Sequence, residues 1–253
     1  MTNEYKLEIC ANSVASCIEA EKGGAWRVEL CAAIPEGGTT PSYGDIVLAR
    51  ELLKIKLHVI IRPRGGDFLY SPLEHRIMLK DIENARKLGV DGVVIGCLTP
   101  EGDVDMNRNR ELIDAAEGLS VTFHRAFDMC RDPYESLERI IELGCDRILT
   151  SGQRPRAEEG IELLHELVQK AGKRIIIMPG SGVNVNNIAK LAKETGVVEF
   201  HLSARESIES RMIYRNPHLK MGGDQIFIDE YAQQVTAANK VAETLVALSN
   251  LSE

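Results

Sequence analysis

A glycine separates the end of a helix from an apolar run in the stretch Leu88-Gly89-Val90-Asp91-Gly92-Val93-Val94-Ile95. Glycine often follows the last turn of a helix because it adopts a left-handed backbone conformation without a Cβ penalty. The run after it is short and β-branched, as in strands that are covered on both faces. The same order recurs in Leu143-Gly144-Cys145-Asp146 before Ile148-Leu149, and in Thr195-Gly196 before Val198-Glu199-Phe200.

Eight apolar runs are separated by segments with helical spacing. The first of these segments, Asn12–Ala25, is expected to form a helix. The runs are Lys6–Cys10, Arg27–Cys31, Leu57–Ile61, Gly92–Gly96, Ser120–His124, Arg147–Thr150, Arg174–Met178 and Val198–Leu202. Strict alternation predicts a parallel sheet with right-handed crossovers. Eight units before about residue 204 predict an α/β protein built as a closed (β/α)₈ TIM barrel. An open doubly wound sheet is the alternative, but the glycine fingerprint of a dinucleotide site does not follow the first strand.

The alternation stops after Ala204. The polar segment Arg205–Gly223 predicts a loop at the mouth of the barrel, and the short run Ile226-Phe227-Ile228 follows it. Tyr231–Leu248 has apolar residues at helical spacing and predicts a closing helix on the outside of the barrel. We therefore predict a single TIM-barrel domain over residues 1–253, in which residues 205–253 form a C-terminal extension.

Composition excludes several classes of protein. The formal net charge of -8 disfavours nucleic acid as a partner, because an acidic surface repels phosphate backbones. The N-terminus shows no secretory signal, and no apolar run approaches the ~20 residues that a membrane span needs. The six cysteines form no Cys-x-x-Cys motif and no pattern of a small disulfide-rich domain. We expect a cytoplasmic protein with free thiols and no membrane partner.

Two strands end in the sequence Glu-x-Cys, as Glu8-Ile9-Cys10 and Glu29-Leu30-Cys31. The loops after the strands form the functional face of such a barrel. Neighbouring strands lie roughly 4.8 Å apart, so the two thiols are expected within reach of one soft ion. Cu(I) prefers thiolate and thioether ligands, which makes Cys10 and Cys31 candidate copper ligands. A third sulfur could come from Cys97, Met129 or Met178. The alternative is two ordinary buried cysteines, because free cysteine is among the most buried residue types.

Other strand ends offer groups for a small anionic ligand. A glycine-rich turn after the seventh strand precedes a helix expected from Asn184, and backbone N–H groups at such a helix start bind phosphate. Arginines follow the third and eighth strands. The anion-binding candidates are Arg62, Arg64, Ser151, Gly180, Gly182 and Arg205. The alternative is that the glycines only permit tight turns.

Acid–base chemistry is a third hypothesis. If the protein is an enzyme, its candidate catalytic residues are Glu8, Glu29, His124 and Asp128, with His201 as a further candidate. Unpaired polar groups inside a barrel are unfavourable, so we expect Glu8, Glu29, Arg62 and His124 to pair with one another. Of the remaining histidines, His58 is expected in the core, and His75, His165 and His218 in solvent.

Several blocks of this sequence together resemble the CutC family, named for copper homeostasis. They are Glu8–Cys10, Glu29–Cys31 with Glu36–Ser42, Ile61–Phe68, Thr122–Asp128, Leu149–Gly152, Met178–Gly180, and Phe200-His201 with Ser203–Arg205. The resemblance runs from about Leu7 to Arg205. It implies a cytoplasmic, usually oligomeric TIM barrel that binds Cu(I) at Cys10 and Cys31. The residues themselves leave open a metal-independent enzyme that acts on a small phosphorylated or anionic metabolite.

Overall fold

Strands and helices alternate along the chain, and the computed structural model describes residues 5–218 and 229–251. The first four units are β1 (Lys6–Ala11), α1 (Val14–Lys22), β2 (Arg27–Leu30), α2 (Tyr43–Leu52), β3 (Lys56–Ile60), α3 (Pro72–Lys87), β4 (Gly92–Ile95) and α4 (Met106–Ala115). The last four are β5 (Ser120–Phe123), α5 (Pro133–Leu143), β6 (Arg147–Thr150), α6 (Ile161–Ala171), β7 (Ile176–Pro179), α7 (Ile188–Thr195), β8 (Glu199–Leu202) and α8 (Ala238–Ser249). Short 3₁₀ helices follow β2, β5 and β6, at Ile34–Glu36, Arg125–Met129 and Ala157–Gly160.

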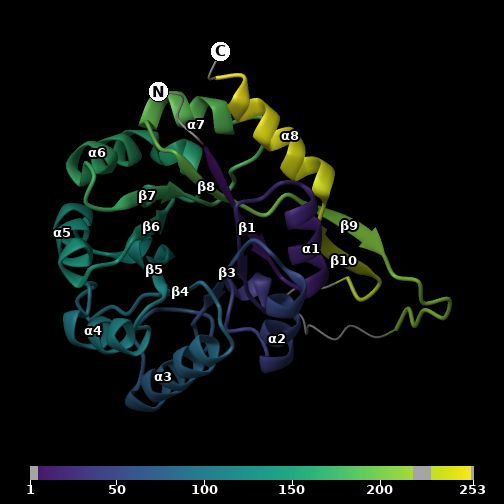
Figure 1. Cartoon of the computed structure of the whole chain (residues 1–253), viewed down its shortest axis with the longest axis horizontal. Helices are drawn as coiled ribbons and strands as arrows, with labels where there is room; N and C mark the ends of the chain where they lie inside the picture. Colours follow the sequence, from purple (N-terminus) through teal and green to yellow (C-terminus); the bar gives the residue numbers. More distant parts are fainter. Residues whose placement is uncertain (1–4, 219–228, 252–253) are drawn as a thin grey trace.

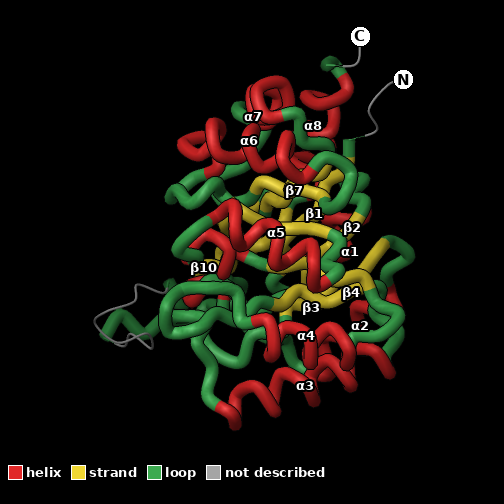
Figure 2. Tube along the Cα trace, turned by 90° about the vertical axis from the view of Figure 1, so that its left-hand side faces the viewer, coloured by secondary structure: helices red, strands yellow, loops and turns green. Residues whose placement is uncertain are grey.

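The eight strands form one parallel sheet in the order β7-β6-β5-β4-β3-β2-β1-β8. Strands β7 and β8 stand at the two ends of this order and lie side by side, so the sheet is a nearly closed barrel (Figure 1). The helices form a layer outside the strands (Figure 2). The predicted TIM barrel is therefore confirmed. No helix in the described part of the chain has the length and apolar character to cross a membrane.

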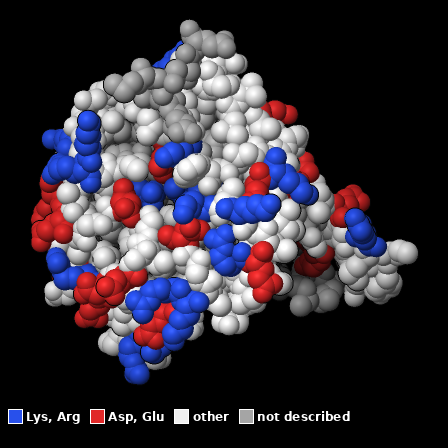
Figure 3. Space-filling model, in the orientation of Figure 1, with Lys and Arg blue, Asp and Glu red and all other residues white. Residues whose placement is uncertain are grey.

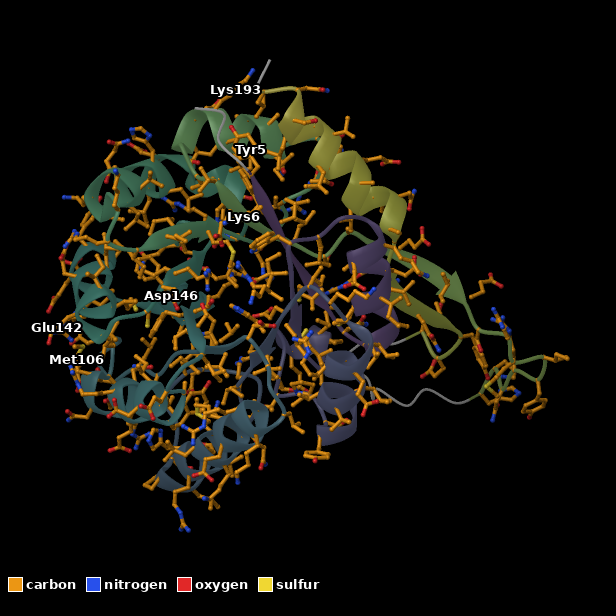
Figure 4. All side chains as sticks on the ribbon, viewed as in Figure 1. Tyr5, Lys6, Met106, Glu142, Asp146 and Lys193 are labelled. Atoms are coloured by element: carbon orange, nitrogen blue, oxygen red, sulfur yellow. The ribbon has the colours of Figure 1, made fainter. Side chains whose placement is uncertain are left out.

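Alternate side chains of each strand face opposite layers. One set, including Ile9, Val28 and Phe200, is buried in the main apolar core that the strands share with the helices. The other set faces the barrel interior and includes the buried charged residues Glu8 and Arg27. Figure 4 shows nitrogen and oxygen atoms among the side chains inside the ring of strands. The interior of this barrel is therefore ionic where many barrels are apolar.

Two glycines, Gly92 at the start of β4 and Gly96 directly after it, make room for histidine rings inside the barrel. A Cβ at Gly92 would lie 2.5 Å from Nε2 of His58 on β3. A Cβ at Gly96 would lie 2.6 Å from Nδ1 of His124, which follows β5. Because real Cβ contacts are longer, any side chain at either position would displace a ring. Glycine is thus required here for space rather than for an unusual backbone angle.

The C-terminal extension differs from the prediction. The expected loop begins with strand β9 (Arg205–Glu209), which pairs in antiparallel fashion with β10 (Ala232–Thr236). The closing helix therefore starts at Ala238 rather than Tyr231, because residues 232–236 are held in the ladder. The hairpin packs against α1 and projects from the side of the barrel (Figure 1), and Arg205, its first residue, reaches Cys10 at the mouth. The run Ile226–Ile228 lies outside the described residues.

Two helix starts and one histidine also differ from expectation. The first helix begins at Val14 because the Ser13 side chain accepts a hydrogen bond from the Ser16 N–H and caps it. The helix expected from Asn184 begins at Ile188. His75, predicted in solvent, is buried, and its Nε2 lies 2.8 Å from the Glu111 carboxylate.

Candidate functional site

A buried ion network lies below the two cysteines inside the barrel. Arg27 of β2 bridges two carboxylates, contacting Glu8 of β1 through Nε and Glu199 of β8 through Nη2 at 2.8 Å. Arg147 of β6 contacts Glu199 at 3.3 Å. The opposite charges satisfy each other, which is the condition under which buried ions are tolerated.

His201 of β8 connects this network to the thiols. Its Nδ1 lies 2.7 Å from Oε1 of Glu8, and its Nε2 lies 3.7 Å from Glu29. Although burial alone raises the pKa of Glu8, Arg27 and His201 bring that pKa well below its ordinary value. Although burial alone lowers the pKa of His201, Glu29 and Glu8 raise it. Burial raises the pKa of Glu29, and Cys10 and Glu8 add to this increase. These surroundings favour the ionised form of Glu8 and the protonated form of His201, whereas burial favours the neutral form of Glu29.

The two cysteines lie together at the ends of β1 and β2. Their sulfur atoms are 3.6 Å apart, and both lie within 4.8 Å of a carboxylate oxygen of Glu29. The backbone holds this arrangement, because the Cys31 N–H donates to the Ala11 carbonyl at 2.9 Å and so extends the β1–β2 ladder. This separation is too long for a disulfide, whose sulfurs are about 2.05 Å apart. It is short enough for one ion to contact both sulfurs with metal–sulfur bonds of about 2.3 Å.

The surroundings of Cys10 favour its neutral thiol form but also place a cation next to its sulfur. The hydrogen bond with Cys31 and burial raise the pKa of Cys10 well above its ordinary value, so this sulfur is a neutral thiol. Nη2 of Arg205 lies 3.5 Å from Sγ of Cys10. A cation at this distance favours a thiolate once an ion replaces the proton.

The three residues considered as a third sulfur ligand lie in three different places in the structure. Cys97 is buried in the outer core, where burial raises its pKa to about 12. Met178 lies in the ion network, with Sδ 3.4 Å from Nη2 of Arg27. Only Met129 lines the same cavity as Cys10.

Cys10 lines a cavity of about 280 Å³ at the mouth of the barrel. Seven residues proposed from the sequence line it together, namely Cys10, Glu29, Arg62, His124, Asp128, Met129 and His201. Cys31 lies beside Cys10, and Glu8 lies deeper, within the ion network. The strand ends therefore converge on a single space.

Four of the predicted anion-binding residues do not line this cavity. Arg64 pairs with Asp67 and Glu74, because their carboxylates stand close by in the same loop and at the start of α3. Ser151 is engaged by Asp128 and the Arg154 carbonyl. A Cβ at Gly180 would meet Leu149, and Gly182, with φ +75°, packs against Arg156. These two glycines are accounted for by close packing and turn conformation.

The predicted pairing of Glu8, Glu29, Arg62 and His124 is wrong. The carboxylates pair with Arg27 and His201 instead, since these residues face the same interior layer on neighbouring strands. Arg62 donates to three backbone carbonyls, and His124 accepts from the Ala126 N–H. Sequence reasoning missed Arg27, although it stands two residues before Glu29 on the same face of one strand.

Surface charge is mixed. On the face shown in Figure 3, basic and acidic side chains are interspersed. This face therefore presents no broad field of one sign.

The sequence matches one protein family over most of its length. The model of the CutC family matches residues 5–206. The family protein CutC of Bacteroides thetaiotaomicron is 62% identical over 248 residues, which cover 98% of this chain and 99% of that protein. The protein of the same name from Bacteroides fragilis is 60% identical over 247 residues, covering 97% of this chain and 98% of that one.

Solved structures agree with these matches. The structure of CutC from Streptococcus agalactiae, described as a copper homeostasis protein, is 39% identical, with a TM-score of 0.76. The match covers 79% of this chain and 98% of that chain. Thiamine phosphate pyrophosphorylase from Pyrococcus furiosus, at 18% identity and a TM-score of 0.59, shares the fold alone; the match covers 99% of this chain and 98% of that chain.

Proposed function

Because the chain belongs to the CutC family, we propose that it binds Cu(I) through the thiolates of Cys10 and Cys31 and acts in copper homeostasis. The observation that carries this proposal is the 3.6 Å between the two sulfurs at the edge of an open cavity. The name of the Streptococcus agalactiae relative supports the same assignment. Cu(I) prefers sulfur donors, so two adjacent thiols suit it better than they suit a hard cation.

Binding exchanges protons for the metal. Thiols bind metals as thiolates, and the raised pKa of Cys10 means that its proton leaves only when the ion arrives. Arg205 then stands beside the negative sulfur. Glu29 is a poor ligand for a soft ion because its donor is a hard oxygen. Burial raises the pKa of Glu29, which disfavours a further negative charge beside the two sulfurs.

The test is a competition titration of the reduced protein with Cu(I) against a chromophoric Cu(I) chelator. We expect the Cys10→Ser/Cys31→Ser variant to lose the site. A Cys130→Ser/Cys145→Ser variant removes the same number of buried thiols from the outer core and should bind as the parent does. Equal Cu(I) affinity in the parent and in the Cys10→Ser/Cys31→Ser variant would refute the proposal.

Location and assembly belong to the same proposal. A reducing cytoplasm would keep both thiols available, whereas an oxidising compartment would favour their linkage. We also propose that the protein forms homo-oligomers, as the family resemblance implies. Light scattering at several protein concentrations tests this, and a monomer at all of them would refute it.

A second proposal is an enzyme that acts on a small anionic metabolite without a metal, and the cavity beside Glu29 favours it. Asp128 is occupied by hydrogen bonds from residues 150–153, and the pKa of His124 is lowered to about 3 by burial and Arg62. His124 is therefore too weak a base to act near neutral pH, and the carboxylate oxygens of Asp128 are already engaged by these donors. Glu29, with its raised pKa, is the candidate general acid. Turnover of a substrate that survives Glu29→Gln would refute this role.

A further inference from the structure

Arg62 differs from the other buried arginines of the barrel in having no carboxylate partner. Arg27 and Arg147 each form an ion pair with a buried carboxylate. Arg62 is 4% exposed, yet within residues 5–218 and 229–251 it forms no ion pair. Backbone carbonyls and the ring of Phe68 stabilise this buried cation without neutralising it, so an anion beside the guanidinium would be favourable.

The hydrogen bonds of Arg62 to backbone carbonyls leave two of its N–H groups without a backbone acceptor, and the Tyr70 hydroxyl lies close to the same guanidinium. Nη1 donates to the carbonyls of Glu36 and Gly38, and Nη2 donates to that of Gly66, all at 2.8 Å. A guanidinium has five N–H groups, so the two that remain are on the adjacent atoms Nε and Nη2. Nε is buried and has no partner among the described residues. Two parallel N–H groups on adjacent nitrogens match the two oxygens of a carboxylate.

His124 provides another unused donor on the same wall. Its Nδ1 accepts a hydrogen bond from the Ala126 N–H at 3.2 Å, so in the neutral ring the proton is on Nε2. Burial, with help from Arg62, lowers the pKa of His124 to about 3, which keeps the ring neutral at physiological pH. Nε2 is also buried without a partner in the described part of the chain.

The ring of Phe68 lies close to both Arg62 and His124. The centroid of its ring lies 5.0 Å from Cζ of Arg62 and 4.8 Å from the centroid of the His124 ring. All three residues line the mouth cavity. Ile60 and Leu149 also line it, so an apolar group has surfaces to contact. At roughly 30 Å³ per water molecule, the 280 Å³ has room for a ligand of several heavy atoms.

We propose that the mouth of the barrel binds a small organic carboxylate, with Arg62 and Nε2–H of His124 as the donors to its carboxylate group. The planar N–H edge, the neutral histidine donor and the apolar walls suit a carboxylate on a short carbon chain. Inorganic phosphate can also form a bidentate contact with a guanidinium, but it would leave the apolar walls unused. The inference rests on the wall that carries Arg62 and His124, not on the thiols or on copper.

The first experiment uses the unmodified protein. Histidine-¹⁵N-labelled protein is titrated at neutral pH with acetate, propionate and succinate, with acetamide and propionamide as neutral isosteres and inorganic phosphate as a separate arm. The carboxylates should shift the His124 Nε2 resonance in a saturable manner, and the amides should not. Equal effects of carboxylate and amide would overturn the proposal. Phosphate binding as tight as that of the carboxylates would overturn the assignment of ligand class.

The second experiment compares two arginine variants by calorimetric titration with the tightest of these carboxylates. Arg62→Gln should weaken binding by about tenfold or more, the effect of losing a charge-assisted contact. Arg64→Gln removes a neighbouring arginine that pairs outside the cavity and should bind as the parent does. Equal losses in both variants would overturn the role of Arg62. If Arg62→Gln does not fold, the labelled-histidine titration of the parent decides alone.

A further arm separates this inference from the copper proposal. The Cys10→Ser/Cys31→Ser variant should keep its carboxylate affinity even though it loses Cu(I). Loss of carboxylate binding in this variant would show that the thiols, rather than the Arg62 wall, hold the anion.

Discussion

Gly92→Ala should destabilise the protein by forcing a methyl group into the ring of His58. The added Cβ would lie 2.5, 2.6 and 2.7 Å from three atoms of the imidazole, where carbon contacts normally need about 3.5 Å or more. The ring would have to move by roughly 1 Å within a fully packed interior. Overpacking of this kind typically costs about 1–3 kcal/mol of unfolding free energy. For a domain of this size, that corresponds to a decrease in Tm of about 2–12 °C.

A double-mutant cycle isolates this contact. Urea unfolding is measured for the parent, Gly92→Ala, His58→Ala and the combined variant. If the clash is real, the combined variant will be more stable than the sum of the single effects predicts, by about 1 kcal/mol or more. Gly44→Ala is the matched control: Gly44 lies in α2, where its nearest neighbour to an added Cβ is 3.9 Å away. It should stabilise the protein by up to about 1 kcal/mol. Strict additivity of Gly92→Ala and His58→Ala would refute the steric argument.

Three further predictions concern charge and metal. Arg27→Met should lower the unfolding free energy by about 3–5 kcal/mol, because Glu8 and Glu199 lose the cation between them, and urea denaturation measures the loss. Acidification should destabilise the protein between about pH 6.5 and pH 3: the pKa of buried His58 is lowered to about 3, chiefly by burial, so the unfolded chain takes up a proton that the folded chain refuses. His58 contributes about 1.4 kcal/mol per pH unit to this slope, and buried His124, whose pKa is also lowered to about 3, contributes similarly, so His58→Gln should reduce the slope by about that amount; an unchanged slope would contradict the assignment. Free Cu(I) at about 100 times its Kd should stabilise the reduced protein by about 2.7 kcal/mol, and a Tm that does not rise would contradict binding to the folded state.

The barrel was predictable because its signals are local and repeated. Each glycine before an apolar run, such as Gly89 and Gly144, fixes where one helix ends, and eight such units in sequence permit few folds. The C-terminal hairpin was not predictable in the same way. Val235 fits a helical spacing with Ala238, but long-range pairing with residues 205–209 decides its conformation. Local periodicity cannot report a partner that lies about thirty residues away.

The site shows the same division between local and long-range information. Alternation along one strand placed Glu8 and Cys10 on one face, and adjacency of β1 and β2 brought Cys31 beside them. Which charges meet across the barrel depends on the stagger between strands, which no single segment encodes. Arg62 and Arg64 illustrate the limit, since they are two residues apart and nevertheless face different environments.

The hydrogen-bonded ladder that extends from Ala11 to Cys31 has a consequence for how an ion would be captured. Both sulfurs are carried by rigid neighbouring backbones and not by a mobile loop, so the chelate is preorganised and little conformational entropy is lost on capture. An ion bound by such a template would load without refolding of the chain, so its capture would leave the backbone of the barrel in place.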